Sequence, residues 1–134
     1  MVPKAVLGTD LAVSSRLRLG SELLLNGFGA SQPERYPETA GLARVALGEQ
    51  VTLGSTGLAI IGGWQVHPLL DLSFMFLTNP RDRSALGFAG LSYSISDNTV
   101  MKGGLYFPVS GRQGVEGEYA LYPTFAFVEL KAVI

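Results

Sequence analysis

The chain of 134 residues contains no cysteine, one histidine and few charged residues. The absence of cysteine excludes disulfide bonds, thiol nucleophiles and zinc sites built on cysteine. Charged residues make up only 16% of the chain, whereas about 25% is usual for a soluble domain. The 10 basic and 11 acidic residues nearly balance, so no broad basic surface predicts a nucleic-acid partner.

Long apolar runs are also absent, although 47% of the residues are hydrophobic. No stretch approaches the ~18 consecutive apolar residues of a transmembrane helix. Residues 1–10, MVPKAVLGTD, lack the charged leader, apolar core and cleavage site of a signal peptide, so none is expected there. The length suits one domain with a sizeable core, and 17 glycines fit a chain of many strands and turns.

Seven segments alternate between apolar and polar residues with the two-residue period of a β-strand. We expect strands at 5–13, 16–27, 57–66, 69–79, 85–96, 99–109 and 119–134. Each is about nine residues or longer, which matches the ~9–11 tilted residues that cross a bilayer. The average strand of a soluble protein has only ~5–6 residues. The segments therefore favour membrane-spanning strands.

Short and long connections alternate along the chain. Tight turns are expected at 14–15, 67–68 and 97–98, and longer connections at 28–56, 80–84 and 110–118. An outer-membrane barrel shows this asymmetry between its rims, with the short turns periplasmic. Within the long outer loop 28–56, PETAGLARVALGEQ (37–50) has helical spacing, which predicts a short surface helix.

Charged residues and large apolar residues fall on opposite faces of the predicted strands. In 99–109, for example, Met101, Leu105 and Phe107 alternate with a face that holds Lys102. Lipid would enforce this sorting, because Arg or Lys at the bilayer midplane costs ~2–4 kcal/mol. An ordinary half-buried antiparallel sheet sorts charges equally well, so this pattern alone leaves both possibilities open. The residues expected to face water inside a barrel and line its pore are Asp10, Arg16, Arg18, Glu22, Asp71, Lys102, Glu129 and Lys131.

Five aromatic residues lie near the predicted ends of the strands. Trp64 and Tyr93 lie near tight turns, and Phe76, Phe107 and Tyr122 lie near the longer connections. Aromatic belts at the two interfaces of a membrane barrel have this placement. Filling of a protein core is the alternative explanation for each of them.

Three polar features give no catalytic or metal site. His67 lies at a tight turn without clustered carboxylates, so neither a metal ligand nor a Ser–His–acid triad is expected. The acidic stretch VEGEY (115–119) is expected to be a solvated loop rather than a calcium site. The stretch PRDR (80–83) is expected to be a solvated turn, with a contact to an anion or lipopolysaccharide as the alternative. We expect no cofactor, no metal and no enzymatic activity.

Four stretches together resemble the C-terminal half of a Gram-negative outer-membrane porin-like β-barrel. They are SELLLNGFG (21–29), VHPLLDLSFMFLTNPRDRSAL (66–86), LSYSISDNTVMKGGLYF (91–107) and YPTFAFVELKAVI (122–134). The resemblance implies an antiparallel up-and-down transmembrane barrel in the bacterial cell outer membrane, a periplasmic C-terminus and assembly by the barrel-insertion machinery. In one respect the chain departs from the family, whose last residue is usually aromatic, because its own last residue is Ile134.

Seven strands are expected to be part of a larger barrel, because single-chain bacterial barrels have an even number of at least about eight. An unclosed edge in lipid leaves unpaired backbone groups, each costing several kcal/mol. The strands at 5–13 and 119–134 are therefore expected to pair with strands from an upstream segment, a partner chain or copies of this chain.

The sequence thus predicts one partial barrel domain over residues 1–134 that contacts outer-membrane lipid. Its expected function is to form part of a pore for passive passage of small polar solutes. One alternative is a barrel scaffold or sheath that holds a partner protein in an envelope complex. Another is a soluble β-barrel that binds an apolar ligand.

Overall fold

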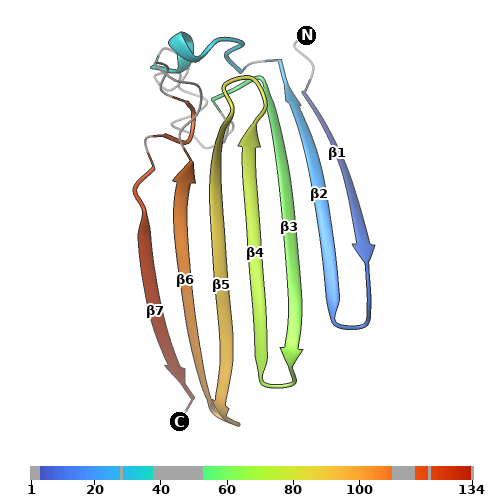
Figure 1. The fold of residues 1–134 in the computed structure, drawn as a ribbon, viewed down its shortest axis with the longest axis vertical. Helices are drawn as coiled ribbons and strands as arrows, with labels where there is room; N and C mark the ends of the chain where they lie inside the picture. The colour runs from blue at the N-terminus through green and yellow to red at the C-terminus, as the bar shows by residue number, and fades with distance from the viewer. Residues whose placement is uncertain (1–3, 28, 38–52, 110–116, 121, 134) are drawn as a thin grey trace.

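The computed structural model describes residues 4–27, 29–37, 53–109, 117–120 and 122–133. Within them the chain is all-β, with seven antiparallel strands in one sheet and in sequence order from β1 to β7 (Figure 1). The strands are β1 (Lys4–Ala12), β2 (Leu17–Asn26), β3 (Thr56–His67), β4 (Leu70–Asn79), β5 (Ser84–Ser96), β6 (Thr99–Val109) and β7 (Phe125–Ala132). The predicted antiparallel meander is confirmed.

The seventh strand is shorter than the sequence predicts. It was expected to cover 119–134, but β7 begins at Phe125. The residues before it form a turn, in which the Tyr122 N–H donates to the Tyr119 carbonyl oxygen (3.2 Å). The side chain of Tyr119 is buried at the end of the sheet, and this burial diverts the chain from a strand path.

The long connection between β2 and β3 contains a short 3₁₀ helix, η1 (Pro33–Arg35). The helix predicted at 37–50 lies almost entirely outside the described residues. A parallel bridge joins Ala30 to Gly54 across this connection, where the Ala30 N–H donates to the Leu53 carbonyl oxygen (2.8 Å). In the part of the chain that the structure describes, no helix is long and apolar enough to cross a membrane.

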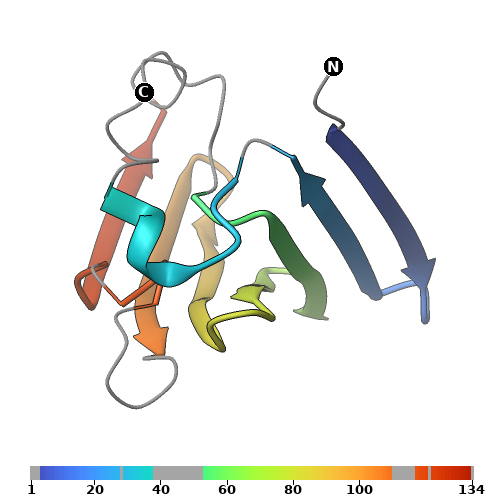
Figure 2. The ribbon, with the colours of Figure 1, turned by 90° about the horizontal axis from the view of Figure 1, so that it is seen from above.

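Each pair of neighbouring strands keeps one register along nearly its whole length. The two irregularities lie next to tight turns, between Gln65 and His67 in β3 and between Ser94 and Ser96 in β5. Such bulges increase the local twist and bend the strand. The sheet is curved when seen from above (Figure 2).

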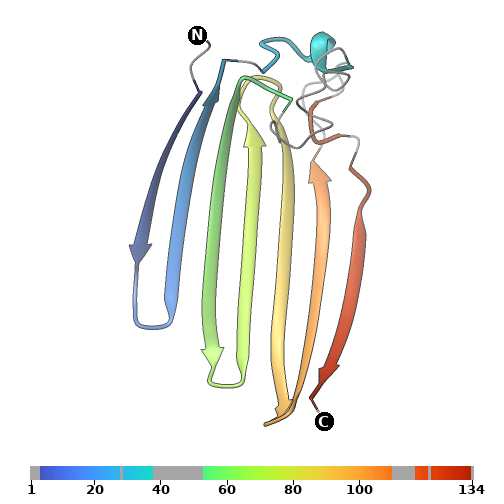
Figure 3. The same cartoon turned by 180° about the vertical axis from the view of Figure 1, so that it is seen from behind.

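The two edge strands do not pair with each other. The order of the sheet places β1 at one edge and β7 at the other, as the view from behind shows (Figure 3). Every residue of β1 and of β7 is exposed. The sheet formed by the described residues is therefore open.

The register divides the strands into two faces, because directly paired residues point to the same side of a sheet. We call one of them the apolar face, because no residue assigned to it carries a charge. Its larger members are Leu7, Leu11, Leu17, Leu19, Leu23, Leu25, Leu58, Ile60, Trp64, Leu70, Leu72, Phe74, Phe76, Leu91, Tyr93, Met101, Leu105, Phe107, Val109, Val128 and Leu130. The opposite side, the polar face, holds the charged residues of the strands.

No other part of the described chain covers the apolar face. Leu7 is 74% exposed, Leu11 61% and Val128 78%, and the aromatic side chains on this face are also exposed. The few buried hydrophobic residues, among them Tyr36, Leu86 and Tyr119, lie instead toward the end of the sheet with the longer connections. The large apolar surface of the sheet is thus not the core of this structure.

Candidate functional site

The polar face carries a row of hydrophilic side chains close to the tight turns. Gln65, Asp71, Ser92, Lys102 and Glu129 are direct cross-strand neighbours in succession from β3 to β7. In this row Lys102 is the direct cross-strand partner of Glu129. Opposite charges directly across an antiparallel pair contribute roughly 0.2–1 kcal/mol to sheet stability.

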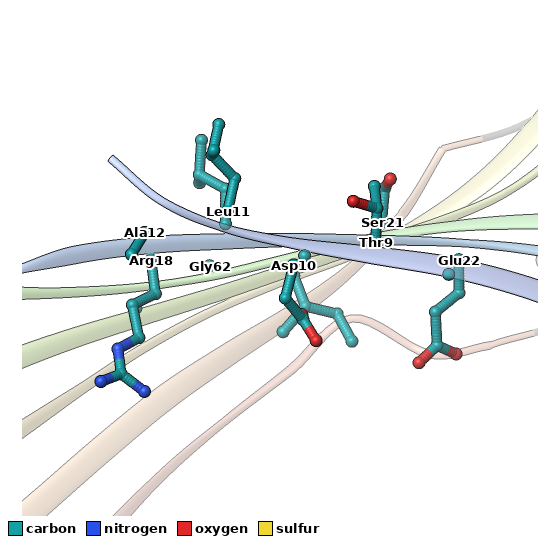
Figure 4. A pocket seen from close by; sticks show the side chains of 13 residues that line it. Thr9, Asp10, Leu11, Ala12, Arg18, Ser21, Glu22 and Gly62 are labelled. Atoms are coloured by element: carbon teal, nitrogen blue, oxygen red, sulfur yellow. The ribbon is translucent and has the colours of Figure 1, made fainter. Parts of the chain in front are cut away.

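A hollow on the polar face of β1, β2 and β3 contains three charged side chains, Asp10, Arg18 and Glu22. Figure 4 shows all three on one side of the ribbon, with Leu11 and Ser21 on the other side. The hollow therefore presents both signs of charge within one patch.

Glycines make room for these charged side chains. Gly20 is the direct partner of Asp10, and Gly8 is the direct partner of Glu22. A β-carbon placed on Gly20 would lie 2.8 Å from the Asp10 Oδ1 atom. The carboxylate therefore occupies space that a side chain at position 20 would need.

The residues predicted to face water do not meet in a single cluster. Seven of them lie on the polar face, but those of β1 and β2 are separated by strands from those of β4, β6 and β7. The members on the polar face are Asp10, Arg18, Glu22, Asp71, Lys102, Glu129 and Lys131. Arg16 lies in the turn between β1 and β2, where its carbonyl oxygen accepts a hydrogen bond from the Gln65 N–H (2.9 Å).

Four of the five aromatic residues expected at interfaces lie on the apolar face. Trp64 and Tyr93 are near its tight-turn end, and Phe76 and Phe107 are toward its other end. They are between 37% and 48% exposed. Tyr122 lies outside the strands, in the segment before β7, and is 48% exposed.

A second group of aromatic residues, which the sequence prediction missed, lies on the polar face. Phe88, Tyr106 and Phe125 are direct neighbours across β5, β6 and β7. The rings of Tyr106 and Phe125 stack with centroids 4.6 Å apart, and those of Phe88 and Tyr106 are 4.5 Å apart. Phe127 adds a fourth ring, 6.5 Å from that of Tyr106. We call these four residues the aromatic row.

A buried group of polar side chains joins the connections at the end of the sheet opposite the tight turns. It consists of Tyr36, Asn79, Asp82, Ser84 and Glu118, which are all buried, and we call it the loop cluster. Asn79 ends β4 and Ser84 begins β5, and these two are direct partners on the polar face. Figure 2 shows the segment around η1 inside the curve of the upper strand ends. The connections thus lie over the polar side of the sheet.

Asp82 is the main acceptor of the loop cluster. Its Oδ1 atom accepts from the Ser84 hydroxyl (2.6 Å) and the Ser84 N–H (2.8 Å). Its Oδ2 atom accepts from the Tyr36 hydroxyl (2.6 Å) and the Glu118 N–H (2.8 Å). Arg83, between Asp82 and Ser84, has a φ of 60°, a left-handed conformation in the turn that presents both neighbours to the cluster.

Glu118 and Asn79 connect the remaining segments. The Leu53 N–H donates to Glu118 Oε1 (2.6 Å), and Asn79 Nδ2 donates to Glu118 Oε2 (3.0 Å). The same Asn79 amide donates to the Tyr36 hydroxyl oxygen (2.8 Å). Each carboxylate oxygen of Asp82 and Glu118 therefore has a donor from the protein itself, which suits a structural tie.

The two carboxyl groups differ in their acidity. Burial raises the pKa of Glu118, and the hydrogen bonds from the Leu53 N–H and Asn79 only partly oppose this effect. Burial also acts to raise the pKa of Asp82, but hydrogen bonds from Ser84, Tyr36 and the Glu118 N–H outweigh it and lower that pKa. The pKa of Tyr36 is raised by burial and by its hydrogen bond to Asp82. Asp82 is thus the carboxylate that the cluster holds in its charged form.

The loop cluster corrects two expectations from the sequence. PRDR (80–83) is the expected turn, and Pro80, Arg81 and Arg83 are exposed, but Asp82 is only 2% exposed. VEGEY was expected to be a solvated loop, but Glu118 and Tyr119 are buried. In both segments the carboxylate finds hydrogen-bond donors from distant parts of the chain, and these compensate for its loss of water.

No grouping in the described part of the chain gathers three or more His, Asp or Glu residues that could hold a metal ion. The Nδ1 atom of His67 accepts a hydrogen bond from the Leu69 N–H at the β3–β4 turn (3.3 Å). This contact makes His67 a turn residue.

Gly54→Ala is expected to destabilise the loop cluster by about 1–3 kcal/mol, the usual cost of overpacking. A β-carbon at this position would collide with Asn79 Nδ2 and lie 2.9 Å from Glu118 Oε2. Gly63→Ala is the matched control, because its new methyl group would meet only the Leu72 carbonyl oxygen at 4.0 Å. Urea unfolding of the two variants in detergent micelles measures the difference, and equal midpoints would contradict the packing described for Gly54.

Comparison with known proteins adds no relative to this description. No protein-family model matches the chain, and no curated protein or solved structure matches it significantly.

Proposed function

We propose that the chain forms part of the wall of a bacterial outer-membrane β-barrel, a porin-like pore for passive passage of small polar solutes. The observation that carries this proposal is the apolar face, which extends across all seven strands without a charge. In water, exposed apolar patches rarely exceed a few hundred Å². Lipid is the solvent that favours such a surface.

The lengths of the strands suit the thickness of a bilayer. They contain between 8 and 13 residues, and β2 and β4 contain 10 each. Ten residues at roughly 3.4 Å each span about 34 Å. Tilted by about 40°, such a strand covers roughly 26 Å of depth, close to the ~25 Å apolar band of outer-membrane barrels.

The polar face would line the water-filled side of this barrel. It carries acidic and basic residues across the sheet, such as the cross-strand partners Lys102 and Glu129, and Asp10 and Arg18 in one hollow. Water-facing charges of both signs set a mixed field rather than a strong preference for cations or anions. The proposed pore therefore passes small polar solutes with weak charge selectivity.

A second candidate function is a barrel that holds a partner protein in its lumen. The aromatic row favours it, because Phe125 and Phe127 lie on the polar face and are 47% and 38% exposed. Exposed aromatic side chains are common anchors of protein interfaces. A lumen filled by protein would block passage of solutes while leaving the contact with lipid unchanged.

The only tryptophan gives a direct test of the proposal. In lipid vesicles we expect Trp64 fluorescence to be quenched by lipids brominated near the headgroup more than by lipids brominated at the chain end, because Trp64 lies on the apolar face near the turns. The control combines Trp64→Phe with Gln65→Trp, which moves the indole to the polar face. Lipid quenching that does not distinguish the two positions would contradict the proposed orientation.

Entry of a small polar solute separates the two candidates, and it is measured in vesicles that hold this chain together with the strands that close its barrel. A pore admits the solute, whereas a barrel that requires a partner to fill it gives entry that falls when the partner is present. No entry, together with lipid contact at Trp64, would retain the wall of a barrel and reject the pore.

A further inference from the structure

We infer that the strands completing this barrel are odd in number, run antiparallel to both β1 and β7, and do not come from further copies of this chain. The inference rests on the proposed function, because only lipid makes an open edge costly enough to require closure. It specifies the partner by strand number and direction.

The direction follows from the topology. Every neighbouring pair from β1 to β7 is antiparallel, so the first and the last strand run in the same direction (Figure 1). An antiparallel neighbour of β1 and an antiparallel neighbour of β7 must both run the opposite way. A meander whose first and last strands run in the same direction has an odd number of strands. An odd number of added strands and the seven strands of this sheet give the even total usual for bacterial barrels.

The backbone of β1 shows which groups would bond the first of these strands. The Val13 N–H donates to the Leu17 carbonyl oxygen (3.0 Å), so the odd-numbered residues of β1 bond β2. The alternation of an antiparallel ladder then turns the N–H and C=O groups of Val6, Gly8 and Asp10 toward the free edge.

The backbone of β7 presents the complementary edge. The Val133 N–H donates to the Asn98 carbonyl oxygen (2.9 Å), so the odd-numbered residues of β7 bond β6. Val128 and Leu130 therefore direct their backbone groups to the other free edge, and their side chains belong to the apolar face. The strand that pairs here must continue this charge-free face.

Copies of this chain fit these edges poorly. In a ring of copies with one orientation in the membrane, β7 of one copy would lie beside β1 of the next, and the two would run parallel. Parallel pairs are slightly less stable, and outer-membrane barrels are antiparallel throughout. Turning alternate copies over restores antiparallel pairing but places their loop clusters on opposite sides of the bilayer.

The first experiment uses the natural absence of cysteine. Thr9→Cys and Val128→Cys are made in separate, differently tagged chains, which are folded together in vesicles and oxidised. We expect no disulfide-linked pair above the level of the cysteine-free chain. An efficient crosslink between the two chains would show that copies close the barrel and would overturn the inference.

The second experiment supplies the missing strands in the Val128→Cys chain. Each extension is added before β1. One is a copy of β6 and another is a copy of β4–β6, and the control is a copy of β5–β6. A cysteine is placed at each position of the first added strand in turn. We expect an intramolecular disulfide to Cys at position 128 from the one-strand and three-strand extensions, at least tenfold more than from the two-strand control.

Two results would overturn the inference in this experiment. One is equal crosslinking by odd and even extensions, and the other is no crosslink from either odd extension. Both are distinguishable from failure of the proposed function, because Trp64 reports contact with lipid whether or not the barrel is closed.

Discussion

Leu105→Arg is expected to lower the ratio of membrane-inserted to uninserted chain by roughly 30- to 700-fold, which corresponds to the ~2–4 kcal/mol cost of a cation at the bilayer midplane. Leu105 lies on the apolar face, between the levels of the two groups of aromatic residues, and is 42% exposed. Its direct partners are Ala89 and Ala126, which are too small to shield a guanidinium group. The measurement is flotation with vesicles followed by extraction with urea.

Ser73→Arg is the matched control for this substitution. Ser73 lies on the polar face, and its direct partner Gly63 leaves room for a long side chain, although the Phe88 ring lies over its other partner, Gly90. Insertion of this variant is expected to match that of the unmodified chain. Gly104 is unsuitable as a control because the Phe127 ring covers it, although it lies on the same face. Equal loss of insertion in Leu105→Arg and Ser73→Arg would contradict the assignment of the two faces.

Asp82→Ala is expected to cost about 3–5 kcal/mol of stability at the loop end of the sheet, because it breaks a buried hydrogen-bonded network around a charge. The substitution removes the acceptor for the Tyr36 hydroxyl, both donors of Ser84 and the Glu118 N–H. These donors would remain without that acceptor. The loss is measured by urea unfolding in micelles and by amide hydrogen exchange at Ser84 and Glu118.

Asp97→Ala controls for the loss of a carboxylate as such. Asp97 is exposed in the tight turn between β5 and β6, so its removal is expected to change stability by no more than about 0.5 kcal/mol. If the two variants unfold at the same urea concentration, or if exchange at Ser84 and Glu118 is unchanged in Asp82→Ala, the loop cluster does not stabilise this end of the sheet.

The strands and their faces could be predicted because both follow from a two-residue period within short segments. In each predicted strand the charged residues occupy alternate positions that avoid the apolar residues, as Lys102 does in 99–109 and Glu129 and Lys131 do in 119–134. The cross-strand pair Lys102–Glu129 places them on one face of the sheet. The aromatic row occupies the same alternate positions as the polar and charged residues of its strands. Phe88 shares this alternation with Ser92, so attention to all side chains rather than to charges alone would have placed this ring on the polar face.

The loop cluster could not be predicted from local sequence. Asp82 lies in a stretch rich in arginine and Glu118 follows a glycine, and both patterns are typical of solvated loops. Their burial depends on donors far away in sequence, such as Tyr36, which is 46 residues from Asp82. The one local signal is Asn79-Pro80, which predicts a turn but not the partners that the turn will meet.

The hydrogen bonds of the loop cluster depend on the register of the strands. All strand pairs join neighbours in sequence, so each hairpin can form before the rest of the sheet is in place. A slip of one residue reverses the side to which every side chain of a strand points. In β4 such a slip would turn Asn79 away from Tyr36 and Glu118. In β5 it would turn Ser84 away from Asp82 and Tyr119, and the hydrogen bonds of the cluster would not form. The cluster thus stabilises the native register selectively, because its hydrogen bonds form only when β4 and β5 are correctly aligned.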